Sequence, residues 1–424
     1  MEVIPGSKLT ELGVFPRDWE IDSLSRFWSV TDCKHVTAKF TANGYPVASI
    51  MEVQSRFLDL TRANQTTQQF YNLLTEGGRK PRAGDLILSR NATVGEVAQV
   101  AEWHPPFAMG QDVCLLRKKS PTLSTNYLQA VFRSPIISNQ LSDLMVGSTF
   151  KRVNVEQIRK LIVPMSPPAE QEAIAEALSD ADTLIECMEQ VLAKKRHIKQ
   201  GAMQELLTGK KRLPGCSDEW ERRPLAYAIE ELEAGVSVNS VEEDAGLFAH
   251  DECILKTSAV LHGRFLPHEA KKIAPQDVAR ARLNPRRDTI VISRMNTPDL
   301  VGECGYVVND YPHLFLPDRL WITRVRAGIG TNVRWLAYLL GTDEYKRQIK
   351  AAATGTSGSM KNISKAALLS LRLRFPQPGE QVAISGVLSD IDAEIVALEA
   401  RLAKVQQLKQ GVAQQLLTGK TRLV

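Results

Sequence analysis

Residues 168–213 read PAEQEAIAEALSDADTLIECMEQVLAKKRHIKQGAMQELLTGKKRL, and residues 378–423 read PGEQVAISGVLSDIDAEIVALEARLAKVQQLKQGVAQQLLTGKTRL. Aligned without a gap, the two stretches are identical at 25 of 46 positions. A long ungapped match at a fixed offset indicates an internal duplication. The copies are separated by about half of the 424-residue chain. The protein therefore consists of two halves, each with a long module followed by a short shared one.

The shared stretch has the apolar spacing of a helix that packs along a narrow seam. Steps of four and three residues separate the apolar positions, which is a heptad pattern. A proline at the start of each copy and a glycine after each Leu-Leu-Thr supply start and stop signals. We expect a helix from about 171 to 207, roughly 55 Å long, and we favour packing of the two helices on each other over two unrelated amphipathic helices. The predicted seam residues are Ile174, Leu178, Ile185, Met188, Leu192, Ile384, Leu388, Ile391, Ile395, Leu398, Leu402 and Val405.

One seam position departs from the pattern. Lys195 stands where its counterpart in the second copy is Val405. A lysine there could fix the register of the helix pair or extend its ammonium group to the edge of the seam, and we favour the second interpretation.

The two long modules are also related, although more distantly. The segment GDLILSRN at 84–91, followed by VGE at 94–96, recurs as RDTIVISRMN at 287–296, followed by VGE at 301–303. Each is an apolar, β-branched run that ends in a polar turn, which predicts a buried strand leading into a loop. Trp19-Glu20 recurs as Trp220-Glu221, and a Gly/Ser/Thr-rich loop at 147–154 recurs at 355–363. A common scaffold with different loops is what two modules with different targets would show.

This order of motifs, present twice, resembles the specificity subunit of type I restriction–modification enzymes. The resemblance covers essentially the whole chain. It implies an α+β protein in which two related α/β target recognition domains are separated by two long helices, packed as an antiparallel coiled coil with a pseudo-two-fold repeat. The implied domains are recognition domain 1 (1–165), spacer helix 1 (166–213), recognition domain 2 (214–374) and spacer helix 2 (375–424).

The resemblance also implies the partners. We expect double-stranded DNA, two methyltransferase (modification) subunits and restriction (translocase and nuclease) subunits, with no membrane partner. S-adenosylmethionine, ATP and Mg²⁺ are expected on the partner subunits and no cofactor on this chain. The first residues lack an apolar signal segment, and the six cysteines form no C-x-x-C pair, so we expect a cytoplasmic protein.

The duplication gives an independent argument for the DNA site. Duplicated halves tend to pack about a two-fold axis, as a homodimer does. Such an axis, perpendicular to the helices, makes them antiparallel and presents two readers to the duplex in inverted orientation. Because the readers differ, we expect an asymmetric, bipartite site, with the helix length acting as a ruler between its halves.

Candidate DNA contacts come from polar and basic loops, because Arg, Lys, Asn, Ser and Thr donate to phosphates and base edges. Arg90 and Arg294 follow the predicted strands and could instead only brace them. In the first module the candidates are Arg79, Lys80, Arg90, Asn91, Thr93, Ser148, Thr149, Lys151 and Arg152. In the second module they are Arg286, Arg287, Arg294, Asn296, Thr297, Ser357, Ser359, Lys361 and Asn362.

The sequence contains no Asn/Asp-Pro-Pro-aromatic methyltransferase motif, no complete phosphate-binding loop and no metal-ligand spacing of His and Cys. We therefore predict no catalytic, cofactor or metal site and a non-catalytic subunit within a type I deoxyribonuclease and adenine methyltransferase complex. The net charge of +5 is compatible with DNA but indicates little alone. Two alternatives stay open: the recognition subunit of another methylation-linked defence system, and a coiled-coil adaptor that does not bind DNA.

Overall fold

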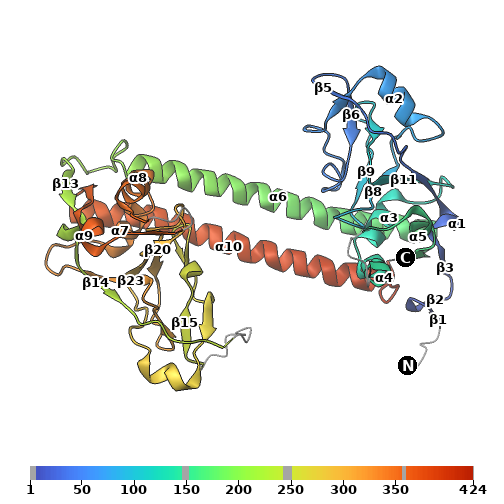
Figure 1. The fold of residues 1–424 in the computed structure, drawn as a ribbon. Coiled ribbons are helices and arrows are strands. Elements are labelled where there is room, and N and C mark those ends of the chain that lie inside the picture. Colours follow the sequence, from blue (N-terminus) through green and yellow to red (C-terminus); the bar gives the residue numbers. More distant parts are fainter. Residues whose placement is uncertain (1–5, 146–151, 242–250, 356–359, 424) are drawn as a thin grey trace. The chain divides into compact units, whose positions relative to one another are not determined.

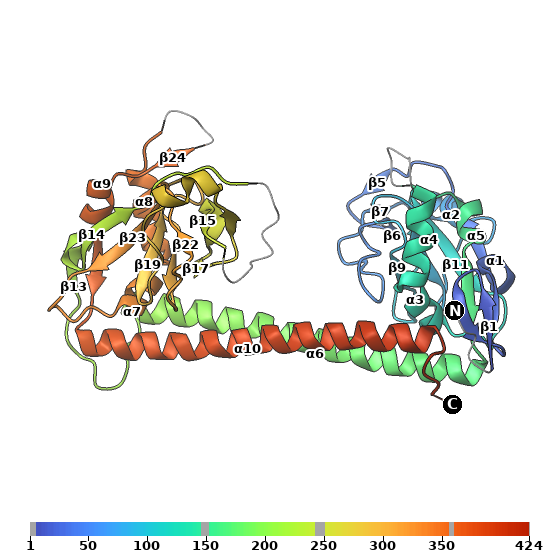
Figure 2. The same ribbon diagram turned by 90° about the horizontal axis from the view of Figure 1, so that it is seen from below.

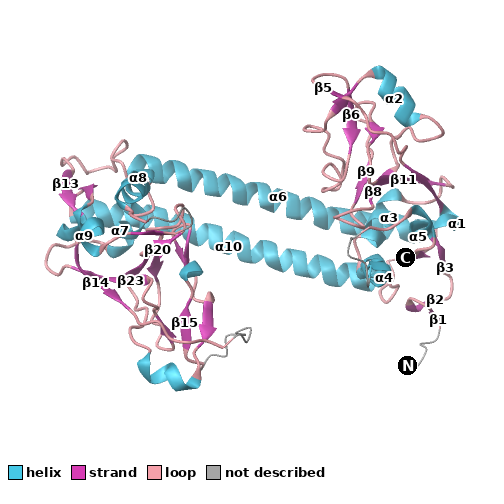
Figure 3. Cartoon of the chain, viewed as in Figure 1, coloured by secondary structure: helices cyan, strands magenta, loops and turns pink. Residues whose placement is uncertain are grey.

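The computed structural model describes residues 6–145, 152–241, 251–355 and 360–423. Two compact units divide the chain: residues 1–190 with 400–424, and residues 191–399. The two long helices, α6 (Pro168–Leu206) and α10 (Pro378–Leu417), each contribute one part to each unit. Figures 1 and 3 show both as continuous helices, which confirms the helix predicted for each shared stretch.

An antiparallel four-stranded sheet forms the centre of the first unit, in the order β4-β11-β8-β9. Its strands are β4 (Trp28–Asp32), β11 (Val113–Lys118), β8 (Leu86–Ser89) and β9 (Val97–Gln99). The other strands of the unit are β1 (Ser7–Thr10), β2 (Gly13–Pro16), β3 (Glu20–Ser23), β5 (Phe40–Thr41), β6 (Tyr45–Ala48), β7 (Gln65–Thr66), β10 (Ala108–Met109) and β12 (Ile162–Met165). Its short helices are α1 (Leu24–Phe27), α2 (Gln68–Thr75), α3 (Thr125–Phe132), α4 (Pro135–Met145) and α5 (Val155–Arg159).

The second unit contains a six-stranded sheet in the order β14-β23-β19-β21-β17-β16. Its strands are β14 (Ile229–Ala234), β23 (Leu320–Val325), β19 (Thr289–Ser293), β21 (Cys304–Val307), β17 (Arg264–Phe265) and β16 (Val260–Leu261). The other strands are β13 (Glu221–Pro224), β15 (Cys253–Leu255), β18 (Ala270–Lys272), β20 (Met295–Asn296), β22 (Leu314–Phe315), β24 (Lys361–Asn362) and β25 (Arg372–Phe375). The helices are α7 (Val333–Leu339), α8 (Asp343–Ala352), α9 (Lys365–Ser370) and the 3-10 turns η1 (Leu225–Tyr227), η2 (Thr257–Ala259) and η3 (Pro275–Arg280).

The two units repeat one topology. The order β4-β11-β8-β9 matches β14-β23-β19-β21, and the antiparallel pair β12-β3 matches β25-β13. The helices follow in the same sequence, with α3, α4 and α5 corresponding to α7, α8 and α9. The strands predicted from the repeated segments GDLILSRN and RDTIVISRMN are β8 and β19, and both are buried. The duplication inferred from the sequence is thus confirmed in the fold.

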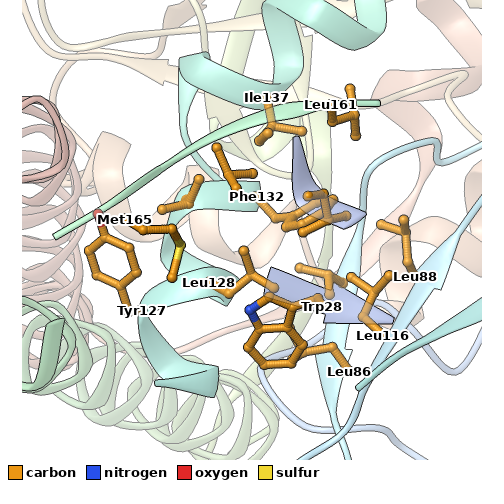
Figure 4. Close-up of a cluster of buried hydrophobic side chains, with 14 of the residues drawn as sticks. Trp28, Leu86, Leu88, Leu116, Tyr127, Leu128, Phe132, Ile137, Leu161 and Met165 are labelled. Atoms are coloured by element: carbon orange, nitrogen blue, oxygen red, sulfur yellow. The ribbon is translucent and has the colours of Figure 1, made fainter. Parts of the chain in front are cut away.

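The core of the first unit lies between its sheet, its short helices and the long helices (Figure 4). Trp28, Leu86 and Leu116 come from the sheet, and Tyr127 and Leu128 come from α3. Ile174 and Leu178 of α6 belong to the same buried cluster, together with Leu416 and Leu417 of α10. The module therefore packs on both long helices, and burial of this apolar surface is the main stabilising contribution to the unit.

A buried glutamate near the start of each long helix joins three segments of its unit. Glu170, which is fully buried, accepts hydrogen bonds from Trp19 Nε1 (2.9 Å) and from Arg422 Nε (2.5 Å). The guanidinium of Arg422 also pairs with Asp18 at 2.8 Å. A carboxylate in the first turn of a helix is favoured by the helix dipole, and the arginine and indole donors satisfy its oxygens.

The second unit has the same arrangement. Glu380 accepts hydrogen bonds from Trp220 Nε1 (2.9 Å) and from Arg212 (2.7 and 2.8 Å). The glutamine after each glutamate also makes an equivalent hydrogen bond in the two units. Gln171 accepts from the backbone N–H of Ser124, and Gln381 accepts from that of Asn332. The repeated Glu-Gln, Trp and C-terminal Arg are therefore structural connections between each module and both helices.

Ion pairs show the direction of helix packing within each unit. In the first unit Lys409 of α10 pairs with Asp182 of α6, and Arg422, beyond the end of α10, reaches Glu170 at the start of α6. In the second unit Lys199 pairs with Asp392 at 2.7 Å, and Lys195, one turn earlier in α6, pairs with Glu394, later in α10. Because higher numbers in one helix meet lower numbers in the other, the helices are antiparallel in both units. This confirms the predicted antiparallel packing.

Most predicted seam residues are shielded from solvent. Lys195 is partly exposed, and its ammonium group pairs with Glu394 of α10, as expected for a lysine that extends to the seam edge. The buried positions are Ile174, Leu178, Met188, Leu192, Ile384, Leu388 and Ile395. The partly exposed ones are Ile185, Ile391, Leu398, Leu402 and Val405.

Within the described ranges, neither a long helix nor a short one combines the length and the apolar character that crossing a membrane requires.

Candidate nucleic-acid interface

In the first unit, the structure brings together two loops that lie about 60 residues apart in the sequence. The loop after β8 and the segment before α5 meet through an isolated antiparallel bridge between Asn91 and Arg152. The carbonyl of Arg90 accepts a hydrogen bond from the backbone N–H of Val153 at 3.0 Å. Two of the predicted contact regions therefore form one continuous surface element.

The second unit contains the equivalent element in a more regular form. Strands β20 and β24 pair antiparallel, with Met295 opposite Asn362 and Asn296 opposite Lys361. The carbonyl of Arg294 accepts from the backbone N–H of Ile363 at 3.0 Å, as Arg90 does from Val153. A short two-stranded ribbon of this kind can approach a DNA groove, because its polar side chains project from an ordered backbone.

Arg90 does not belong to the exposed surface. Its side chain is buried, with 3% of the residue exposed, and its Nη2 lies 2.7 Å from Asp32 Oδ1. A guanidinium enclosed in this way has no surface to offer a phosphate group. We therefore correct its assignment from a DNA contact to a brace, which was the second interpretation of its position at the end of a strand.

Arg294 is partly exposed, unlike Arg90. Its guanidinium carbon lies 5.8 Å from the centroid of the Trp321 ring, which is a cation–π distance. Its Nε is buried and has no hydrogen-bond partner in the described part of the chain. Arg294 is thus stacked at the base of the β20–β24 ribbon and keeps an unused donor.

The polar residues of the two loops are largely occupied in holding the loops themselves. Asn91 Oδ1 accepts from the backbone N–H of Ala92 (2.9 Å), and Asn296 Oδ1 accepts from that of Thr297 (2.9 Å). The hydroxyl of Thr93 lies 3.0 Å from that of Ser89. Such local bonds are typical of Asx and Ser/Thr turns. The amide nitrogen of Asn296 also donates to Ser293 Oγ (3.3 Å), so the amide nitrogen of Asn91 is the asparagine donor best able to reach a base.

The exposed cations are the stronger candidates for phosphate contacts. Arg152 is exposed and forms a loose pair with Asp112 (3.4 Å). Lys361 is only partly exposed, and it donates from Nζ to the carbonyl of Gly355 (3.0 Å), a bond that a phosphate oxygen could replace. Lys80 and Arg286 are exposed as well.

The remaining predicted cations lie either near the first element or at the end of β19 that is opposite the β20–β24 ribbon. Arg79 donates from Nε to the carbonyl of Asp32 (3.0 Å), the residue that also pairs with Arg90, so it lies near the first element. Arg286 and Arg287 precede β19, whereas Arg294 follows it. Because a strand is extended, the structure separates these two arginines from the β20–β24 ribbon. Ser148, Thr149, Lys151, Ser357 and Ser359 lie outside the described residues.

One group of side chains has the composition of a metal site. Ligand atoms of Asp32, Cys33 and His35 lie within 4.8 Å of one another. The guanidinium of Arg90 sits among them, 3.7 Å from Cys33 Sγ, and burial raises the pKa of the Cys33 thiol. A fixed positive charge and a protonated thiol both oppose a bound cation. The chemistry of this group is that of an ion pair between the buried Arg90 and the partly exposed Asp32.

This chain is similar to known proteins both in sequence and in fold. The family model for the type I restriction modification DNA specificity domain matches residues 16–194. A specificity subunit named for the type I restriction enzyme MjaX of Methanocaldococcus jannaschii is 25% identical, covering 98% of this chain and 96% of its own. The crystal structure of the type I restriction–modification S subunit from M. genitalium matches with a TM-score of 0.60 at 13% identity, covering 98% of both chains. A chain from a structural study of complex assembly in the type I system matches with a TM-score of 0.54 at 17% identity, over 96% of this chain and 99% of that one.

Proposed function

Because this chain belongs to the family of type I restriction–modification specificity subunits, we propose that it reads an asymmetric, bipartite DNA site and holds the catalytic subunits on it. Each module reads one half-site. The module of residues 1–165 reads through the loops around Asn91 and Arg152, and that of residues 214–374 reads through the β20–β24 ribbon.

One observation carries this proposal: a single chain contains two modules of the same topology whose equivalent loops differ in sequence. Asn91 and Arg152 stand where the second module has the four residues of β20 and β24. Different donors on a common scaffold would read different bases, because each base edge presents its own pattern of donors and acceptors. A single palindromic target would need no such difference.

The chain supplies recognition, and its partners supply catalysis. We propose that two methyltransferase subunits and the restriction subunits assemble on it; in support, one of the similar solved chains comes from a study of complex assembly of the type I restriction–modification system. S-adenosylmethionine, ATP and Mg²⁺ would then be held by those subunits, because the transfer of a methyl group and the cleavage of DNA both need groups that this chain is not proposed to provide.

The test is an exchange of modules in the assembled enzyme. Residues 1–165 are replaced by the equivalent module of a relative with a known target, and methylated sites are mapped across the genome. We expect only one half of the methylated sequence to change. The reciprocal exchange of residues 214–374 serves as the matched control and should change only the other half. If one exchange altered both halves, the modules would not read independently, and if the complex were not retained on duplex DNA, an adaptor function would be favoured.

A further inference from the structure

The first unit contains a cavity of about 510 Å³ between α3, α4 and the long helices. Its lining includes Ala130 of α3, Ser179 and Asp182 of α6, and Lys409 of α10, all within this unit. Figure 2 shows α3 and α4 beside the long helices in this part of the chain. A volume of this size is within the range of ligand-binding pockets.

The second unit shows what fits such a space, because the duplication provides the equivalent residues. Ala130 is the sixth residue after the cap of α3, Ser124, and Tyr338 is the sixth after the cap of α7, Asn332. The hydroxyl of Tyr338 donates to Asp392 Oδ2 at 2.6 Å and lies 3.5 Å from Ser389 Oγ. The ammonium of Lys199 lies 5.7 Å from the centroid of the tyrosine ring.

Each partner of Tyr338 has its counterpart on the cavity wall of the first unit. Asp392 and Ser389 correspond to Asp182 and Ser179 in the aligned repeats, and Lys199 corresponds to Lys409. The ion pair Lys409–Asp182 reproduces the pair Lys199–Asp392. The phenol is missing because alanine stands at position 130, so the acceptor, the hydroxyl and the cation that surround a tyrosine in the second unit line an open cavity in the first.

The charges around the cavity indicate the character of the occupant. Arg56, Arg133 and Lys409 contribute three positive charges to the lining, and Asp182 contributes the one negative charge. Asp182 is already paired with Lys409, so the two arginines leave an excess of positive charge. A protein segment that inserts a tyrosine and carries acidic residues beside it would complement both the acceptor in the cavity and the arginines at its edge.

We propose that this cavity receives a tyrosine from an acidic segment of the methyltransferase subunit bound at the first unit. The inference rests on the proposed function. Since Tyr338 fills the equivalent space in the second unit, the two methyltransferase copies are held by non-equivalent contacts. The copy at the first unit has an aromatic anchor in a pocket, a feature that commonly dominates the affinity of an interface.

The experiment compares binding of the system's methyltransferase subunit to the full-length chain and its variants, by native mass spectrometry and calorimetric titration. Ala130→Tyr places in the cavity the side chain that the second unit has at the equivalent position, and Ala130→Ser leaves that position open. We expect Ala130→Tyr to weaken one of the two binding events by roughly 30-fold or more, which corresponds to about 2 kcal/mol. The other event, and all binding by Ala130→Ser, should match the unmodified chain.

A second pair of variants keeps the test decisive if Ala130→Tyr does not fold. Asp182→Asn and Asp392→Asn each remove one equivalent helix ion pair, but only Asp182 faces the cavity. Asp182→Asn should weaken one binding event by about tenfold, as expected for loss of a hydrogen bond to a charged group, and Asp392→Asn should not. Equal effects of the two variants, or full-strength binding by folded Ala130→Tyr, would overturn the inference. If the unmodified chain bound no methyltransferase subunit at all, the proposed function itself would fail.

Discussion

Replacing Arg422 by alanine tests whether the C-terminal segment holds the first unit together. Arg422 joins residues of three segments, because it hydrogen-bonds Glu170 at the start of α6 and Asp18 beside Trp19. Without it, the fully buried carboxylate of Glu170 keeps only Trp19 as a hydrogen-bond donor among the described residues. Hydrogen bonds to charged groups contribute about 1.5–3 kcal/mol each.

Solvent exposure reduces the free energy that the hydrogen bonds of Arg422 contribute to stability. The side chain of Arg422 is 36% exposed and that of Asp18 is 51% exposed, so the pair with Asp18 is screened and contributes little. The bond to buried Glu170 carries most of the effect, and we expect a loss of about 2 kcal/mol. For a unit of this size, such a loss lowers the melting temperature by roughly 4–8 °C.

The assay is differential scanning calorimetry of the full chain, with hydrogen exchange of the β3 and α6 peptides to locate the change. Arg401→Ala is the matched control, because Arg401 is exposed on α10 and forms no ion pair among the described residues. It should change stability by less than about 0.5 kcal/mol. A double-mutant cycle with Glu170→Gln should give a coupling of about 1 kcal/mol or more. An Arg422→Ala variant that melts with the Arg401→Ala control would refute the reasoning.

The same variant has a predicted pH dependence. In the unmodified chain, the hydrogen bond from Arg422 lowers the pKa of Asp18. A carboxyl group with a lowered folded-state pKa stabilises the protein above its unfolded pKa, and this contribution is lost as the pH falls through the folded value. The part of the Arg422→Ala effect that comes from Asp18 should therefore be present at neutral pH and disappear below roughly pH 4. An effect that grew on acidification would contradict this assignment.

Four further predictions follow from the fold and the proposed function. Lys361→Ala should weaken binding to specific and random duplexes alike and lower the salt slope of binding by about one, measured in salt titrations; a loss confined to one sequence would make Lys361 a base reader. Arg90→Ala should destabilise the first unit by about 3 kcal/mol in calorimetry, because it leaves Asp32 without its buried partner, whereas the exposed Arg152→Ala should leave stability unchanged and weaken DNA binding. Inserting four residues before Leu206 adds about 6 Å of helix, and methylation mapping should show sites whose unread spacer is longer by one or two base pairs; an active enzyme with the original spacer would end the ruler hypothesis. The purified chain alone should not methylate DNA when S-adenosylmethionine is supplied, and methylation by a verified single-chain preparation would show that the catalytic centre is on this subunit.

The candidate DNA contacts show where pattern reasoning succeeds and where it stops. The Ser-Arg segments after the apolar runs were correctly predicted to follow buried strands, because apolar, β-branched runs report burial directly. Whether the arginine then faces solvent depends on partners elsewhere in the chain. Arg90 is enclosed by Asp32 and Cys33, whereas Arg294 stacks on Trp321 and stays partly exposed. The same local pattern therefore has two outcomes.

By itself, the sequence determined the duplication, the two long helices and their heptad seams. These features depend on local periodicity and on comparison of the chain with itself, and neither requires knowledge of distant contacts. Only the tertiary structure showed why Glu170 and Glu380 recur, because their donors, Trp19 with Arg422 and Trp220 with Arg212, are more than 150 residues away in the sequence. It also showed that Ala130 and Tyr338 occupy equivalent positions with opposite consequences. A cavity depends on the side chains that several distant segments bring together, so no local sequence pattern predicts it.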